Sequence, residues 1–154
     1  MTLVITTLRK NPEYLLQAAM LWDSVESRLW EPEPGYILTK LQPCTDPDAS
    51  RTALIVLSGL AVIGLAVLQP TAEVSEDIGP WLSYLVVHPT FRCLGIARQL
   101  IAEICRQSHS KSVYLFTANA TLPNYYKSLG WESFQQTIFR GLPALIMKYT
   151  LKDG

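Results

Sequence analysis

The chain has 154 residues, a length typical of one domain and sufficient for a substantial hydrophobic core. Its 13 Lys and Arg residues balance its 13 Asp and Glu residues, so it lacks the net positive charge that attracts proteins to nucleic acid or to an anionic membrane. We therefore predict one domain, residues 1–154, with neither partner.

The first elements have the pattern of a strand followed by an amphipathic helix. Residues 3–8 form the strand, and Asn11 and Pro12 mark a helix start, with Asn as the cap and Pro at the first helical position. Apolar residues then recur at helical spacing: Leu15, Ala18, Ala19, Trp22, Val25 and Leu29. Pro and Gly in residues 31–35 end this helix. Residues 36–41 are either a short helix or an extended segment, and residues 43–50 are turn-rich.

An almost wholly apolar stretch covers residues 53–68. It is shorter than the roughly 20 residues that cross a bilayer, and Ser58-Gly59 interrupts it, so we predict two strands, at 52–57 and 62–69. With a strand at 81–87 they form an antiparallel meander. A helix from residue 96, a strand at 113–117, a short helix at 123–129 capped by Gly130, and strands at 132–139 and 144–151 complete a mixed α/β sheet.

The segment from Trp81 to Leu100 is the most informative part of the chain. Its apolar strand ends at Pro89, a short loop carries Arg92 and Gly95, and a helical pattern begins at Ile96. Free backbone N–H groups at a helix start, together with the positive end of the helix dipole, form a site for a phosphate or pyrophosphate. The segment therefore predicts a phosphorylated cofactor.

Two motifs in this chain resemble those of the GNAT superfamily of N-acetyltransferases. The spacing Arg92-x-x-Gly95-x-Ala97 after a strand resembles the acetyl-CoA loop of that family. Downstream, Asn119 precedes Tyr126 by 7 positions and Leu129-Gly130-Trp131 closes the helix, as in the family. The resemblance covers about residues 50–151. It implies an α/β fold with a mostly antiparallel sheet of about seven strands, flanked by helices and splayed between strands four and five, and acetyl-CoA (CoA) as cofactor.

The reaction itself indicates which residue types are needed. Transfer of an acetyl group from a thioester to an amine requires a neutral amine, a site for the oxyanion and a proton for the departing thiolate. A tyrosine, with a pKa of about 10, supplies that proton while staying neutral at pH 7. Its interval from Asn119 and Gly130 favours Tyr126 as the general acid over Tyr125, which lies about 100° away around the helix.

The predicted cofactor contacts fall into two groups. Backbone N–H groups from Cys93 to Arg98 would hold the pyrophosphate, because Gly95 and Ala97 are small enough to let the backbone approach closely. The resemblance implies that strand residues 85–87 present their backbone to the amide groups of the pantetheine arm, with Asn119 beside the arm. The whole predicted set, which includes no metal ligand, is Leu85, Val86, Val87, Arg92, Cys93, Leu94, Gly95, Ile96, Ala97, Arg98, Asn119 and Tyr126.

The chain departs from the family at the general base. Many relatives place a Glu on the fourth or fifth strand, where this sequence has Ser83 or Tyr84 and Tyr114. An acceptor amine with a lowered pKa would need no base, and the base is left unassigned. The residues that remain candidates through a water are Glu73, Glu76, Asp77 and His88.

The acceptor also stays open among a polyamine, an aminoglycoside, an amino acid and a peptide N-terminus. A cationic amine is weakly favoured by acidic residues expected to border the acceptor side of the cleft, namely Glu31, Glu33, Asp46, Asp48, Glu73, Glu76 and Asp77. The hairpin at Gly141 either lines this cleft or pairs with a second subunit, so both a monomer and a homodimer are open.

Two other hypotheses compete with an enzyme. One is a catalytically silent acyl-CoA-binding module for regulation or interaction, and the other is a small α/β protein with no CoA site. As for the compartment, the three cysteines are odd in number and have neither metal-ligand nor redox spacing, which favours a reducing environment. The N-terminus lacks the pattern of an export signal, and we expect a cytoplasmic protein.

Overall fold

The computed structural model describes residues 2–30 and 33–151, and within α1 the side chains up to residue 25. The described residues form a seven-stranded sheet with the order β1-β2-β3-β4-β5-β7-β6. Its strands are β1 (Leu3–Thr7), β2 (Thr52–Ser58), β3 (Ala61–Gln69), β4 (Trp81–Val87), β5 (Ser112–Thr117), β6 (Glu132–Phe139) and β7 (Leu142–Thr150). Neighbouring strands are antiparallel except β4 and β5, which are parallel. The predicted mixed, mostly antiparallel sheet is confirmed.

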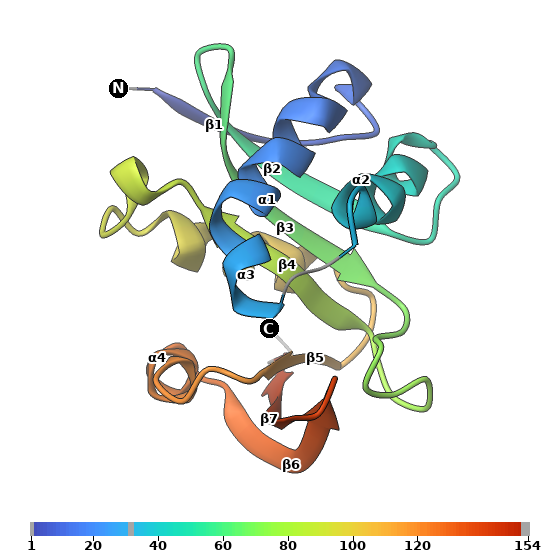
Figure 1. Ribbon diagram of the computed structural model, residues 1–154, viewed down its shortest axis with the longest axis vertical. Helices are drawn as coiled ribbons and strands as arrows, with labels where there is room; N and C mark the ends of the chain where they lie inside the picture. The colour runs from blue at the N-terminus through green and yellow to red at the C-terminus, as the bar shows by residue number, and fades with distance from the viewer. Residues whose placement is uncertain (1, 31–32, 152–154) are drawn as a thin grey trace.

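Helices cover both faces of this sheet. The helices α1 (Leu15–Trp30) and α2 (Tyr36–Leu41) lie in front of β2, β3 and β4 in Figure 1 and pack on one hydrophobic cluster. The helix α3 (Ile96–Gln107) packs on a second cluster on the opposite face. The helix α4 (Leu122–Ser128) lies beside β5, β6 and β7 in the lower part of the view.

The two covered faces explain the apolar stretch at residues 53–68. Residues 53–56 of β2 and 62–67 of β3 are all buried, because one side of each strand meets α1 and the other meets α3. The turn between the strands lies at Gly59 and Leu60, where Gly59 has a φ of 60°. The prediction of two strands is confirmed. Among the described residues, no helix combines the length and apolarity that a bilayer crossing needs.

Three sequence-based boundaries need comment. The α-helix predicted from Pro12 begins at Leu15, after a 3₁₀ turn. Asn11 does not cap it, because its side-chain amide donates instead to Thr6 Oγ1 at 2.8 Å and to Thr7 O at 3.1 Å. Residues 36–41 are helical. The last strand begins at Leu142 rather than at residue 144, since a two-residue turn joins it directly to β6.

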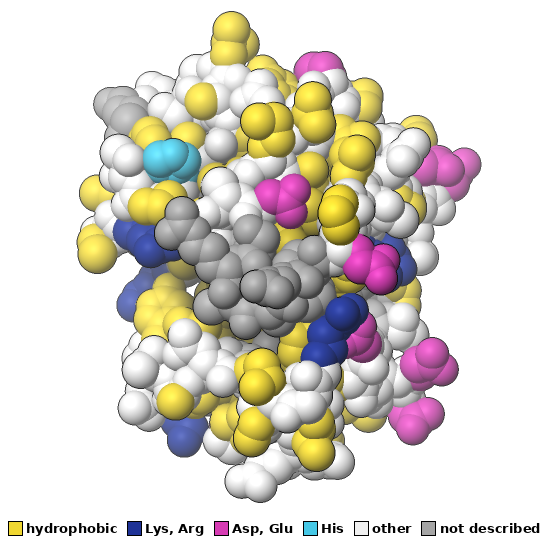
Figure 2. Space-filling model, viewed as in Figure 1, with side chains coloured by type: hydrophobic (Ala, Val, Ile, Leu, Met, Phe, Trp, Pro, Cys, Tyr) yellow, Lys and Arg dark blue, Asp and Glu magenta, His cyan; other side chains and the backbone are white. Residues whose placement is uncertain are grey.

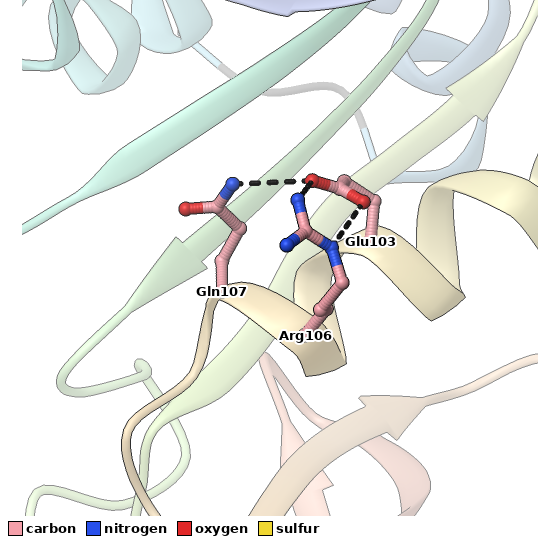
Figure 3. A network of polar contacts seen from close by, with 3 residues as sticks. All are labelled: Glu103, Arg106 and Gln107. Atoms are coloured by element: carbon pink, nitrogen blue, oxygen red, sulfur yellow. Dashed lines mark hydrogen bonds and ion pairs between the residues drawn. The ribbon is translucent and has the colours of Figure 1, made fainter.

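A network of polar side chains links residues in the C-terminal part of α3 (Figure 3). Arg106 donates to both carboxylate oxygens of Glu103, with Nε 2.9 Å from Oε2, and Gln107 Nε2 donates to Oε1 at 3.2 Å. These i,i+3 and i,i+4 contacts stabilise the helix, and the hydrogen bond from Arg106 lowers the pKa of Glu103. The same helix carries the predicted phosphate-binding turn at its other end.

Candidate functional site

The cleft of the molecule opens where β4 and β5 separate. In the described chain these two strands share a single register pair, Trp81 with Tyr114. Beyond it, no strand among the described residues pairs with the β5-facing edge of β4 from Leu82 to Val87. The cleft has a volume of about 390 Å³, and both strands line it, β4 with residues 82–85 and β5 and the loop after it with residues 115–119. The predicted splay is therefore present.

A bulge in β4 lies beside this separation. Leu65 of β3 pairs with Val86, but Val67 pairs with Ser83, so β4 contains an extra residue between these pairs. Tyr84 lies in the bulge with a φ of 56°, a left-handed conformation that is uncommon for an aromatic residue. Bulges bend a strand and redirect its side chains, and this one lies in the part of β4 that lines the cleft.

The helix α4 places Tyr126 in the cleft. Tyr126 is 7% exposed and packs against the buried Trp131, with ring centroids 6.1 Å apart. Its neighbour Tyr125 is 38% exposed and is not among the residues that line the cleft. Gly130 ends the helix, with a φ of 100° and its N–H donating to Lys127 O at 3.0 Å, so the predicted cap is confirmed. Of the two tyrosines, Tyr126 has the position that a group acting in the cleft requires.

Two further predicted residues meet Tyr126 there. Leu85 lines the cleft from β4, and Asn119 lines it from the end of β5. Asn119 also holds the start of the next helix, because its Oδ1 accepts hydrogen bonds from Thr121 N at 2.8 Å and from Thr121 Oγ1 at 2.7 Å. Asn119 thus joins a turn-forming role to its place in the cleft.

The turn before α3 presents a row of main-chain donors. The first N–H of the helix with an intrahelical acceptor belongs to Gln99, which donates to Gly95 O at 3.1 Å. Within the described residues, no N–H from Cys93 to Arg98 donates to a protein acceptor. Cys93 and Gly95 are both left-handed, with φ values of 65° and 79°. Such a concave run of amides at a helix start fits a diphosphate.

The side chains of the predicted cofactor set divide by exposure. Arg92, Cys93, Leu94, Gly95 and Arg98 are exposed and Ala97 is partly buried. Ile96, Val86 and Val87 are buried in the hydrophobic clusters. Val86 and Val87 can therefore present only their backbone to a ligand, and residues 92–98 lie outside the lining of the cleft.

Comparison with known proteins identifies this arrangement. The protein-family model described as the acetyltransferase (GNAT) domain matches residues 50–133, more than half of the chain. The chain belongs to the GNAT acetyltransferase family. A search of curated proteins finds no significant match to the sequence.

Solved structures share the fold over nearly the whole chain. A GNAT-family acetyltransferase from Desulfovibrio desulfuricans has a TM-score of 0.78 at 16% identity, covering 97% of this chain and 99% of its own. An aminoglycoside 6'-N-acetyltransferase complexed with coenzyme A has a TM-score of 0.72 at 16% identity, covering 98% of each chain. The NatC complex bound to Gag peptide and CoA includes a chain with a TM-score of 0.71 at 19% identity, covering 99% of this chain and 100% of its own. At sequence identities of 16–19%, these matches show that the fold is shared and nothing about the substrate.

The candidate bases of this GNAT domain lie in different places. Glu73 lines the cleft, whereas Glu76 and Asp77 are exposed and do not. His88 caps a 3₁₀ turn, its Nδ1 accepting from Thr90 N at 3.1 Å, and it also lies outside the lining. Tyr114 is buried against Trp81.

Most of the acidic residues predicted to border the acceptor side of the cleft do not line it. Asp46 lines a separate hollow beside Arg51, and Glu31 lies outside the described residues. Glu33, Asp48, Glu76 and Asp77 are exposed but do not line the cleft. On the face shown in Figure 2, acidic side chains lie mostly on the right-hand side of the view, and basic ones are scattered on both sides. Glu73 is the single charged side chain in the described lining of the cleft.

Sequence reasoning missed a group of hydrogen-bonded polar side chains in the lining of the cleft. Gln69, 7% exposed, donates from Nε2 to Ser83 Oγ at 2.9 Å. The hydroxyls of Tyr36 and Tyr84 lie 3.1 Å apart. Burial, and then the hydrogen bond with Tyr36, raises the pKa of Tyr84, so that phenol stays neutral. A glutamine ending an otherwise apolar strand was the one signal of this group that the sequence contained.

Proposed function

We propose that this protein is an N-acetyltransferase that moves an acetyl group from acetyl-CoA to a primary amine of a small molecule or peptide by direct attack. One observation carries the proposal: the unpaired edge of β4, Asn119 and Tyr126 meet in one cleft. The amides of residues 93–98, which have no protein acceptor in the described chain, follow the same strand.

The residues present fit this cofactor. The amides of residues 93–98 would bind its diphosphate, where the helix dipole also favours negative charge. The edge of β4 from Leu82 to Val87 would hydrogen-bond the amides of the pantetheine arm as an added strand does. The chemistry that the bound cofactor supplies is an acetyl group activated as a thioester. Structures of family members with CoA support this choice.

Tyr126 would act as the general acid. A tyrosine phenol ordinarily has a pKa of about 10 and a thiol one of about 8.5, so a phenol beside the departing sulfur can donate its proton. The burial of Tyr126 against Trp131 keeps the ring in one place. Tyr84 stays neutral and cannot serve as a base at this pH, so we assign to the hydroxyls of Tyr84 and Tyr36 the positioning of the acceptor by hydrogen bonds rather than proton transfer.

A panel of primary amines, monitored by release of free thiol, tests the proposal. Acetyl-CoA at 100 times its Kd should stabilise the fold by about 2.7 kcal/mol, a rise in Tm of roughly 5–11 °C for a chain of this size. Binding without thiol release across the panel would indicate the silent acyl-CoA-binding module. No shift of Tm at millimolar acetyl-CoA would indicate that the CoA site is absent.

The variant Tyr126→Phe tests the general acid, and Tyr125→Phe on the same helix is its matched control. Both changes remove one hydroxyl, but only Tyr126 lines the cleft. We expect Tyr126→Phe to lower kcat by about 100-fold or more, as loss of a general acid does, with little change in acetyl-CoA affinity. Tyr125→Phe should keep kcat within a factor of two. An unchanged kcat in Tyr126→Phe would remove Tyr126 from the mechanism.

A further inference from the structure

Two hydrogen bonds between side chains hold the bulge of β4 from different elements. In the bulge, two residues of β4 lie opposite one residue of β3. Ser83, directly before it, accepts at Oγ from Gln69 Nε2 of β3 at 2.9 Å. The hydroxyl of Tyr84, within it, lies 3.1 Å from the hydroxyl of Tyr36 on α2. The conformation of this part of β4 therefore depends on a neighbouring strand and on a helix.

The Tyr36 ring is itself packed on more than one side. The ring centroid of Trp22, on α1, lies 5.9 Å from that of Tyr36 and 6.0 Å from that of Tyr84. Trp22 is 3% exposed. The Arg140 guanidinium lies 5.7 Å from the Tyr36 centroid, and its Nε donates to Glu73 Oε2 at 2.9 Å. These contacts fix the position from which the Tyr36 hydroxyl meets Tyr84.

The backbone of Tyr84 needs such support. Among the described residues, Tyr84 alone has a positive φ inside a strand, at 56°. A left-handed conformation costs an L-residue free energy, and it persists only where the surrounding structure determines it. The hydrogen bond with Tyr36 and the edge-on contact with Trp22 provide that determination.

The same part of β4 forms the edge that the cofactor would use. Ser83, Tyr84 and Leu85 all line the cleft. The side chain of Tyr84 packs with the cluster beneath α1 and α2, and that of Leu85 packs with the cluster beneath α3. Because a bulge bends its strand and re-aims the groups beside it, the direction of the edge amides depends on the conformation at Tyr84.

We propose that the hydroxyl pair of Tyr36 and Tyr84 positions the edge of β4 for the pantetheine arm of the cofactor. Tyr84 is a positioning residue that acts through its own backbone, and Tyr36 supports it from α2. Gln69 fixes the preceding residue in the same way. This role precedes any contact of the two hydroxyls with an acceptor. The inference rests on the proposed acetyl-CoA site and adds to it a helix that lies outside both sequence motifs.

The affinity for acetyl-CoA, measured by isothermal titration with no amine present, tests this inference. Tyr36→Phe and Tyr84→Phe each remove one hydroxyl of the pair, and each should weaken binding by about twofold to tenfold, the range for one neutral hydrogen bond. Because both changes remove the same contact, the double variant should bind no more weakly than either single variant. Tyr14→Phe removes a hydroxyl from the same hydrophobic cluster but outside the cleft, and it should keep the wild-type Kd.

ADP locates the effect within the cofactor. It carries adenosine and a diphosphate but no pantetheine arm, so its affinity, measured by displacement of acetyl-CoA, should stay within a factor of two in every variant. Equal weakening for ADP and acetyl-CoA, or additive losses in the double variant, would show a general loosening and overturn the proposal. An unchanged Kd for acetyl-CoA in both single variants would also overturn it. If the wild-type protein binds no acetyl-CoA, the proposed cofactor site fails first, and this inference fails with it for a different and visible reason.

Discussion

Replacement of Gly95 by Ala should weaken cofactor binding without disturbing the core. Gly95 has a φ of 79°, and a Cβ atom added there would meet nothing within 4 Å. The cost of the change is therefore conformational rather than steric. A left-handed backbone costs an L-residue about 1–2 kcal/mol, and this strain is the whole expected perturbation.

The position of Gly95 determines how that strain is expressed. Residues 92–95 are exposed, so little packing would hold an alanine at this position in the left-handed conformation when the cofactor is absent. The turn should relax in the free protein, and binding should restore it at a cost of about 1–2 kcal/mol. This cost corresponds to an affinity for acetyl-CoA that is roughly fivefold to thirtyfold weaker.

Gly59→Ala is the matched control. Gly59 has a φ of 60° and also meets nothing within 4 Å, but it lies in the turn between β2 and β3. This variant should lose about 1–2 kcal/mol of stability, a fall in Tm of roughly 2–8 °C, and keep the wild-type Kd. Isothermal titration with acetyl-CoA and thermal melts measure both quantities. Equal affinities in Gly95→Ala and Gly59→Ala would refute the binding of the diphosphate at this turn.

Three further outcomes follow from burial and charge. Leu100→Ala shortens a fully buried side chain on the core-facing side of α3 and should lower the free energy of unfolding in urea by about 2–5 kcal/mol. A loss below about 1 kcal/mol would contradict this packing. Cys93 is exposed and the other two thiols are buried, and burial raises the pKa of Cys44 and raises that of Cys105 to about 11. A thiol reagent at about pH 8 should therefore modify one cysteine rapidly in the native protein and three after denaturation. Acetyl-CoA should slow the rapid reaction, because Cys93 lies in the proposed diphosphate-binding turn. The pKa of Glu103 is lowered in the folded state, so its stabilising contribution is present at neutral pH and is lost as the pH falls below about 4.5. As the pH falls below about 4.5, the free energy of unfolding of Glu103→Gln should therefore decrease less than that of the wild type. An equal decrease in both proteins would contradict this.

Features that depend on neighbours in sequence were predicted well. The two-strand interpretation of residues 53–68 needed only the length of the apolar run and the Ser-Gly break. The turn before α3 followed from a strand, a glycine and the start of a helical pattern. The family interval from Asn119 pointed to Tyr126 rather than Tyr125, and the structure buries Tyr126 in the cleft; its role as the acid stays a prediction.

Local signals failed where a side chain chose a partner outside its own element. Asn11 has the residue type of a helix cap, but its amide turns back to Thr6 and Thr7 at the end of β1. The acidic residues expected around the cleft could not be placed from composition, because charged residues are common in surface loops for solubility alone. Only the folded chain shows that Glu73 reaches the cleft and that Asp46 lies elsewhere.

By itself the amino-acid sequence determined the order of the strands and helices, the amides offered at the start of α3, and Tyr126 as the candidate acid. The elements and the amides follow from periodicity and turn chemistry over a few residues, and Tyr126 follows from the resemblance of its motif spacing to that of the GNAT family. The tertiary structure alone decided the bulge at Tyr84, the approach of Tyr36 to it, and the ion pair between Glu73 and Arg140, which are 67 positions apart. The physical reason is that each of these contacts depends on strand register and sheet order, and both are settled only when all seven strands pack together.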